Sequence, residues 1–85
     1  MTNRISLSEL KPGQTALIEQ VAQTPETVGF VQRLAALGIV PQRSIEVLRV
    51  AGFGGPLHIR VGTTEVAIRP AEARCVRVRL ISREQ

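Results

Sequence analysis

The sequence contains no Asp, Trp or Tyr, and only one Cys, one His and one Met among 85 residues. A single cysteine, Cys75, cannot form an internal disulfide and is typical of a reducing compartment. With Phe30 and Phe53 as the only aromatic residues, the core has to be built from Val, Ile, Leu and Ala. No apolar run is long enough to span a bilayer or to form the core of a signal peptide. We therefore expect a cytosolic domain that reaches any membrane through a partner.

These absences also exclude most chemistry. A nucleophile–base pair of Cys75 with His58 is formally possible, but the two residues fall on different predicted strands. A metal site needs three or four convergent ligands, and Glu46 and Glu65 would join those two residues only through tertiary contact. Residues 52–55 are rich in glycine but lack the Lys of a phosphate-binding loop. The sequence thus predicts no enzyme, cofactor or metal site, with Cys75 as a small buried residue and His58 as a solvated one.

The charge is strongly biased towards positive residues. The chain has eleven Lys and Arg residues but seven Glu residues, which gives a net charge of +4 and an isoelectric point near 11.1. The basic residues are spread along the predicted strands and do not form runs, so a solvated basic face is the simplest interpretation. A small barrel that binds nucleic acid is the alternative, although the aromatic residues on which single-stranded bases stack are missing.

The most informative segment reads as a short helix that ends abruptly. Phe30, Leu34 and Leu37 recur at helical spacing. Gly38 stands where a residue of positive φ commonly ends a helix, and Pro41 prevents the helix from continuing. A helix stop followed so closely by strand-like alternation narrows the fold to a few small architectures.

Period-2 alternation predicts five strands, at residues 15–21, 44–50, 57–61, 65–69 and 75–80. Short helical turns are expected at residues 6–10 and 70–74, and Gly62-Thr63 is expected to form a type II′ hairpin turn. The chain is read as a single domain over residues 1–85, with its core at about 5–81. The predicted fold is mainly β: a small, partly open, five-stranded SH3-like barrel with one inserted α-helix and short helical turns.

In this order, these elements resemble the FeoA family, small cytosolic proteins of bacterial ferrous iron transport. Family members commonly carry Met-Gly-Leu at the helix stop and Pro-Gly after it. This chain departs from that pattern at Leu37 and at Gln42. The matching segments are 6–14, 33–41, 44–50, 54–57 and 65–73.

The resemblance implies an SH3-like barrel and a role in assisting the membrane transporter FeoB, whose cytosolic part is G-protein-like. The domain also resembles the C-terminal module of some iron-dependent repressors, so a FeoA-like regulatory module is an alternative. The stand-alone interpretation is preferred because no helix-turn-helix sequence precedes the domain in this chain.

Protein–protein binding is the activity that we expect. Phe53 lies in a glycine-rich loop, where it either anchors a partner or folds back over the barrel mouth. Small barrels also bind through open strand edges, so a homo-oligomer is a further possibility. An acidic partner would associate faster with an outer surface that carries five arginines: Arg49, Arg60, Arg69, Arg77 and Arg79.

Overall fold

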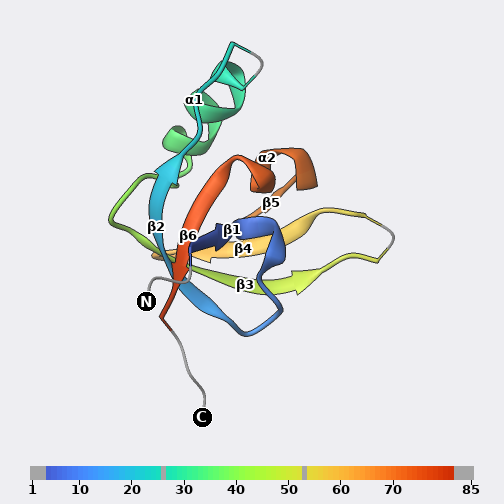
Figure 1. Ribbon diagram of the computed structural model, residues 1–85. Coiled ribbons are helices and arrows are strands. Elements are labelled where there is room, and N and C mark those ends of the chain that lie inside the picture. Colours follow the sequence, from blue (N-terminus) through green and yellow to red (C-terminus); the bar gives the residue numbers. More distant parts are fainter. Residues whose placement is uncertain (1–3, 26, 53, 82–85) are drawn as a thin grey trace.

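The computed structural model describes residues 4–25, 27–52 and 54–81. In this part of the chain, antiparallel strands form one strongly curved sheet in the order β1-β6-β2-β3-β4-β5 (Figure 1). The strands at the two ends of this order pair with one neighbour each, so the barrel is not closed by hydrogen bonds. The strands are β1 (Arg4–Ser6), β2 (Thr15–Val21), β3 (Ser44–Val50), β4 (Leu57–Val61), β5 (Thr64–Ile68) and β6 (Val76–Leu80).

The predicted mainly β fold with an inserted helix and short helical turns is confirmed, and three strands have the predicted bounds. The structure adds a sixth strand to the five expected, because Arg4–Ser6 pairs with β6. Three residues are too few to show a period-2 pattern. β5 begins and ends one residue earlier than predicted, at Thr64 and Ile68, because Arg69 caps the helix after it. β6 starts one residue later than predicted, because Cys75 caps the same helix at its other end.

The core lies inside the curve of the sheet and is built from the inward-facing residues of adjacent strands. Ile18 of β2 is paired with Val78 of β6, and Val47 of β3 is paired with Ile59 of β4. All four side chains are fully buried. Each such burial stabilises the fold by roughly 1.5–3 kcal/mol, so aliphatic residues alone can hold this small barrel together.

Two short helices close one end of the barrel: the 3₁₀ helix η1 (Leu7–Glu9) and α2 (Pro70–Arg74). Ser6 begins η1 with the predicted capping box, since its side chain accepts from the Ser8 amide and Glu9 binds back to the Ser6 amide. The Ser6 hydroxyl also donates to the Ala73 carbonyl over 3.2 Å and so ties η1 to α2.

The helix α1 (Val28–Ala36) ends as its sequence predicts. Gly38 has φ +91°, and its amide donates to the Ala35 carbonyl over 3.0 Å. The Ile39 amide donates to the Leu34 carbonyl over 2.9 Å, which completes a Schellman motif. Leu34 and Ile39 are both buried, so the motif also carries its usual apolar contact.

The turn that follows brings the chain back to β2. Gln42 has φ +79° and is the non-glycine residue of positive φ in the described part of the chain. Its amide donates to the Ile18 carbonyl over 2.8 Å, and the Ile18 amide donates to the Arg43 carbonyl over 2.8 Å. Gln42 thus takes the backbone conformation that the glycine of the Pro-Gly pattern would adopt at little cost.

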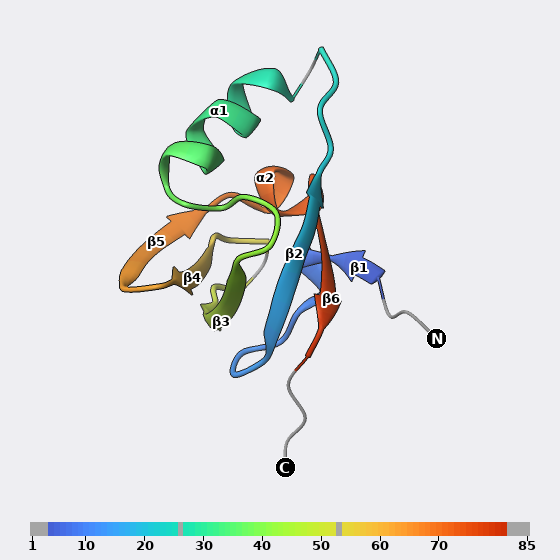
Figure 2. The ribbon, with the colours of Figure 1, turned by 90° about the vertical axis from the view of Figure 1, so that its left-hand side faces the viewer.

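α1 lies over the barrel and is set off from the sheet by the loop that leads into it (Figure 2). Leu34 is the buried residue of this helix, whereas Val28 in its first turn is 42% exposed. Thr27 is the N-cap by position, and its hydroxyl binds back to the Ala22 carbonyl. No helix in the described residues is both long and apolar enough to cross a membrane.

Candidate partner-binding surface

The outer face of β2 to β5 carries a row of paired polar side chains. Thr15, Glu46, Arg60 and Glu65 lie opposite one another on four consecutive strands. Arg60 Nη2 donates to Glu46 Oε1 over 2.8 Å, and Arg60 Nη1 donates to Glu65 Oε2 over 3.4 Å. The hydrogen bond to Glu46 is the largest of the effects that raise the pKa of Arg60. The guanidinium at the centre of this face is therefore already bound to two carboxylates.

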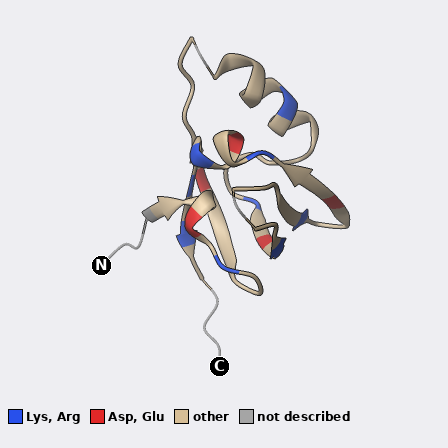
Figure 3. Cartoon of the chain, turned by 90° about the vertical axis from the view of Figure 1, so that its right-hand side faces the viewer, with Lys and Arg blue, Asp and Glu red and all other residues tan. Residues whose placement is uncertain are grey.

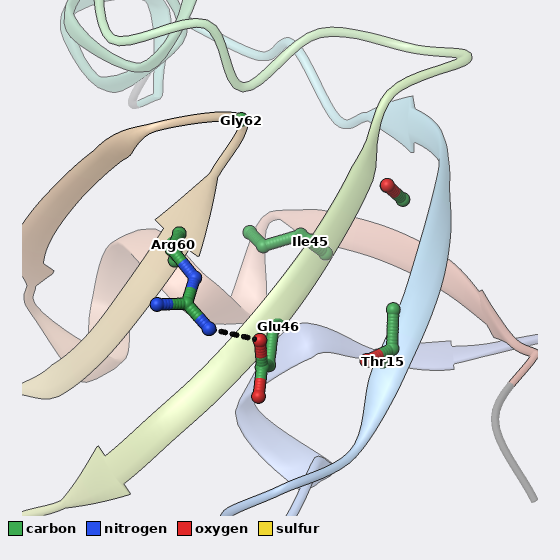
Figure 4. A pocket seen from close by; sticks show the side chains of 6 residues that line it. Thr15, Ile45, Glu46, Arg60 and Gly62 are labelled. Atoms are coloured by element: carbon green, nitrogen blue, oxygen red, sulfur yellow. Dashed lines mark hydrogen bonds and ion pairs between the residues drawn. The ribbon is translucent and has the colours of Figure 1, made fainter.

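A shallow, open hollow of about 190 Å³ lies along this row (Figure 4). Its volume is smaller than that of typical small-molecule sites, which is about 300–1,000 Å³. Its lining is mostly polar, so the hollow suits one polar side chain of a partner better than a cofactor. Its lining residues are Thr15, Ser44, Ile45, Glu46, Arg60 and Gly62.

The other predicted surface residues lie around this row. Arg49 is paired with His58 across β3 and β4, and both belong to the outer face. Arg49 is exposed and makes no ion pair to a described residue. Arg69 follows β5 and is the N-cap residue of α2. Phe53 lies outside the described residues, so its predicted role as an anchor stays a prediction from the sequence.

The five arginines predicted on one surface do not gather in one cluster. Arg77 and Arg79 belong to β6, which is separated from β4 by β2 and β3. Arg79 Nε donates to Glu19 Oε2 over 2.7 Å, so its charge is partnered as well. Figure 3 shows basic and acidic positions interspersed over the chain. The cations that make no ion pair to a described residue are thus scattered, and they do not form a continuous basic stripe.

Cys75 and His58 belong to different elements, the end of α2 and the strand β4. Cys75 is the C-cap of α2 and is 8% exposed, and its thiol donates to the Ala71 carbonyl over 3.4 Å. Burial is the main effect that raises the pKa of this thiol. No group of three or more His, Cys, Asp or Glu side chains gathers in the described ranges. The interpretation of Cys75 as a small buried residue is confirmed.

Sequence reasoning missed two ion-pair contacts of the structure. It treated Arg60 as a free cation, although the predicted two-residue turn places Arg60 and Glu65 directly opposite each other. It also did not pair Arg33 of α1 with Glu72 of α2, which are 39 positions apart. The first pair could have been found from hairpin register, whereas the second depends on how α1 packs.

The model of the FeoA domain matches residues 5–80 of this chain. Among solved structures, a zinc complex of FeoA from Stenotrophomonas maltophilia, a prokaryotic SH3 domain protein, is 32% identical and gives a TM-score of 0.77. That match covers 87% of this chain and 88% of the other. FeoA from Chlorobium tepidum is 31% identical over 95% of this chain and 74% of the other, with a TM-score of 0.78.

A manganese-dependent transcriptional repressor shares the fold, with a TM-score of 0.81 at 17% identity. This chain matches 44% of that protein, and 95% of this chain is covered. The expected SH3-like fold is therefore confirmed. With its domain model matched over residues 5–80, the chain belongs to the FeoA family, which is tied to ferrous iron transport.

Proposed function

We propose that this protein is a cytosolic, non-enzymatic accessory of bacterial ferrous iron uptake that binds the cytosolic region of FeoB and modulates transport. The observation that carries the proposal is the FeoA domain over residues 5–80. The described residues support binding over catalysis, because the polar groups on the outer face are tied to one another. This face can contact the surface of a partner, but it presents no reactive group.

The surface that we assign to the partner is the outer face of β3 and β4 near Arg49. This cation is exposed and makes no ion pair to a described residue, whereas Arg60 beside it is held by two carboxylates. An unpaired rim cation steers an acidic partner and changes the association rate more than the final affinity. Arg69 and Phe53 are the remaining candidates, the latter on sequence grounds alone.

Nucleic-acid binding is less favoured by the same charge pattern. Arg33, Arg60 and Arg79 are each bound to a carboxylate, so their charges are compensated before any phosphate approaches. A net charge of +4 that is spread in this way gives weak, sequence-independent attraction with a steep salt dependence.

The test is the rate of binding to the cytosolic domain of the FeoB from the same organism, measured without nucleotide, with GDP and with a GTP analogue. We expect Arg49→Glu to slow association by roughly 3- to 10-fold at low salt. Arg77→Glu on β6 is the matched control, since Arg77 is exposed and makes no ion pair to a described residue. Phe53→Ala tests the anchor predicted from the sequence.

Absence of binding in every nucleotide state would overturn the proposed function. Equal slowing by Arg49→Glu and Arg77→Glu would retain the function but reject the surface, because general charge would then explain the rate. Binding to an unrelated RNA with comparable affinity at physiological salt would favour the nucleic-acid alternative.

A further inference from the structure

The strand β5 forms a long edge of the sheet. It pairs with β4 on one side, and no strand of the described chain pairs with its other side (Figure 2). Its five residues contain no Pro, no Lys and no bulge, which commonly protect an edge from pairing, and Glu65 is the one charged residue among them. The opposite edge differs: β1 has three residues, and the Ser6 amide at its end already binds Glu9.

The hairpin register identifies the backbone groups at this edge. Gly62, with φ +61°, and Thr63 form a two-residue turn, so the closing pair Val61–Thr64 exchanges both hydrogen bonds. Because hydrogen-bonded and non-hydrogen-bonded pairs alternate along an antiparallel ladder, Glu65 and Ala67 are in non-hydrogen-bonded pairs with β4. Their N–H and C=O groups therefore point to the free side.

The row of free groups ends at Arg69. Its amide donates to Glu72 Oε1 over 2.9 Å, and its carbonyl accepts from the Ala73 amide over 3.0 Å. The edge of β5 thus offers two donors and two acceptors, all from Glu65 and Ala67.

A second copy of this chain can satisfy all of these groups in one register. With Val66 on the twofold axis, Glu65 of each copy lies opposite Ala67 of the other, and the two residues exchange both hydrogen bonds. The diagonal neighbours of Glu65 are then Arg69 and Glu65 of the second copy, so one favourable and one unfavourable charge pair lie on the two diagonals, and no like charges lie directly opposite each other.

The two neighbouring registers are worse. An axis at Glu65 places two carboxylates directly opposite each other, and like charges in that position are destabilising. An axis at Ala67 places Glu65 opposite Arg69, but the backbone groups of Arg69 are already used by α2, so Glu65 loses its hydrogen bonds. The edge is therefore self-complementary in a single register.

We propose that β5 is a self-association site, at which two copies of the chain pair antiparallel with Val66 on the twofold axis. The inference does not depend on the proposed function. Four hydrogen bonds and little apolar area make a small interface, and both copies carry +4, so the dimer is weak. Glu65 and Ala67 face outwards, so pairing would join the outer faces of both copies into one surface.

A cysteine scan along the edge tests the register. In a Cys75→Ala background, single cysteines at Glu65, Val66 and Ala67 are exposed to a mild oxidant at high protein concentration. We expect Val66→Cys to form the intermolecular disulfide fastest, by about tenfold or more, because only the axis residue lies opposite itself. Fastest cross-linking at either neighbour, or equal rates at all three, overturns the proposal.

Sedimentation equilibrium tests the edge itself. We expect the natural chain to show a monomer–dimer equilibrium with a Kd between micromolar and millimolar, of the order of magnitude typical of small interfaces. Ala67→Pro removes an amide that faces the free side, so the dimer is lost, and Ala67→Ser is the matched control that keeps it. A chain that stays monomeric at millimolar concentration, or a dimer that survives Ala67→Pro, contradicts the proposal. Should Ala67→Pro not fold, the cysteine scan still decides.

Discussion

The carboxylate of Glu72 on α2 binds the guanidinium of Arg33 on α1, with Arg33 Nη1 3.1 Å from Oε2 and 3.3 Å from Oε1. Glu72 is 3% exposed and Arg33 is 49% exposed, so a half-exposed cation covers a buried carboxylate. Glu72 Oε1 also accepts the Arg69 amide at the start of α2. The Glu72 side chain therefore caps the start of α2 and also holds α1 over α2.

Substitutions of Glu72 separate these two roles. Glu72→Gln retains an acceptor for the Arg69 amide but removes the charge, and we expect a loss of about 1 kcal/mol because the cation is half exposed and screened by water. Glu72→Ala removes the cap as well and costs about 2 kcal/mol. Urea unfolding measures both values. A double-mutant cycle with Arg33→Ala should give a coupling near 1 kcal/mol, and Arg74→Ala is the control. A coupling of zero would mean that the ion pair does not hold α1.

Replacing Gly29 or Gly38 by alanine should change the stability of the protein in opposite directions. Gly38→Ala forces a side chain into φ +91°, with an expected loss of about 1–2 kcal/mol from the backbone, since the nearest side-chain atom, Val61 Cγ1, would lie an ordinary 3.8 Å away. Gly29 lies within the helix, and a Cβ added there would meet no atom within 4 Å, so Gly29→Ala should stabilise the protein by about 0.5–1 kcal/mol. Thermal unfolding of both variants checks the signs, and stabilisation by Gly38→Ala would contradict the Schellman ending.

Gln42 stands in a backbone conformation that favours glycine. Its φ of +79° costs about 1 kcal/mol or more for a residue with a Cβ, of which part is returned by the lower backbone freedom of the unfolded chain. We therefore expect Gln42→Gly to stabilise the protein by about 0.5–1 kcal/mol. Gln32→Gly, in the middle of α1, is the matched control and should destabilise by about 1 kcal/mol. A loss of stability in Gln42→Gly would show that the Gln side chain contributes more than its backbone costs.

Local patterns predicted most of this fold, because the elements are short and each carries its own signal. The capping box at Ser6, the stop at Gly38 and the turn at Gly62 depend on neighbours within a few residues. The sixth strand, Arg4–Ser6, was not predicted because its formation depends on β6, more than 70 positions away.

The candidate surface was predicted less well than the fold. The alternation of apolar and polar residues placed Arg49 and Arg60 correctly on the outer face of β3 and β4. The partners of Arg60 could be inferred only from register, and the contact of Arg33 with Glu72 only from the position of α1 over α2. Composition indicates how many charges there are, whereas tertiary packing determines which of them are still available to a partner.

The buried thiol of Cys75 makes stability depend on pH in the alkaline range. Burial raises its pKa above the ordinary value of 9.0, and the nearby Arg74 opposes this effect. The folded state then binds the thiol proton more tightly than the unfolded state. This contribution is fully present below about pH 9 and is lost as the pH rises through the pKa of the folded state.

Cys75→Ala isolates that contribution, because every other titrating group is shared by the two proteins. We expect the natural chain to be the more stable of the two at pH 7 and its advantage to shrink between pH 9 and pH 11, as measured by urea unfolding at a series of pH values. The thiol should also react slowly with an alkylating reagent at pH 7, since little thiolate is present and the side chain is 8% exposed. An advantage that grows with pH would mean that the folded state lowers the pKa of Cys75, and that Arg74 outweighs burial.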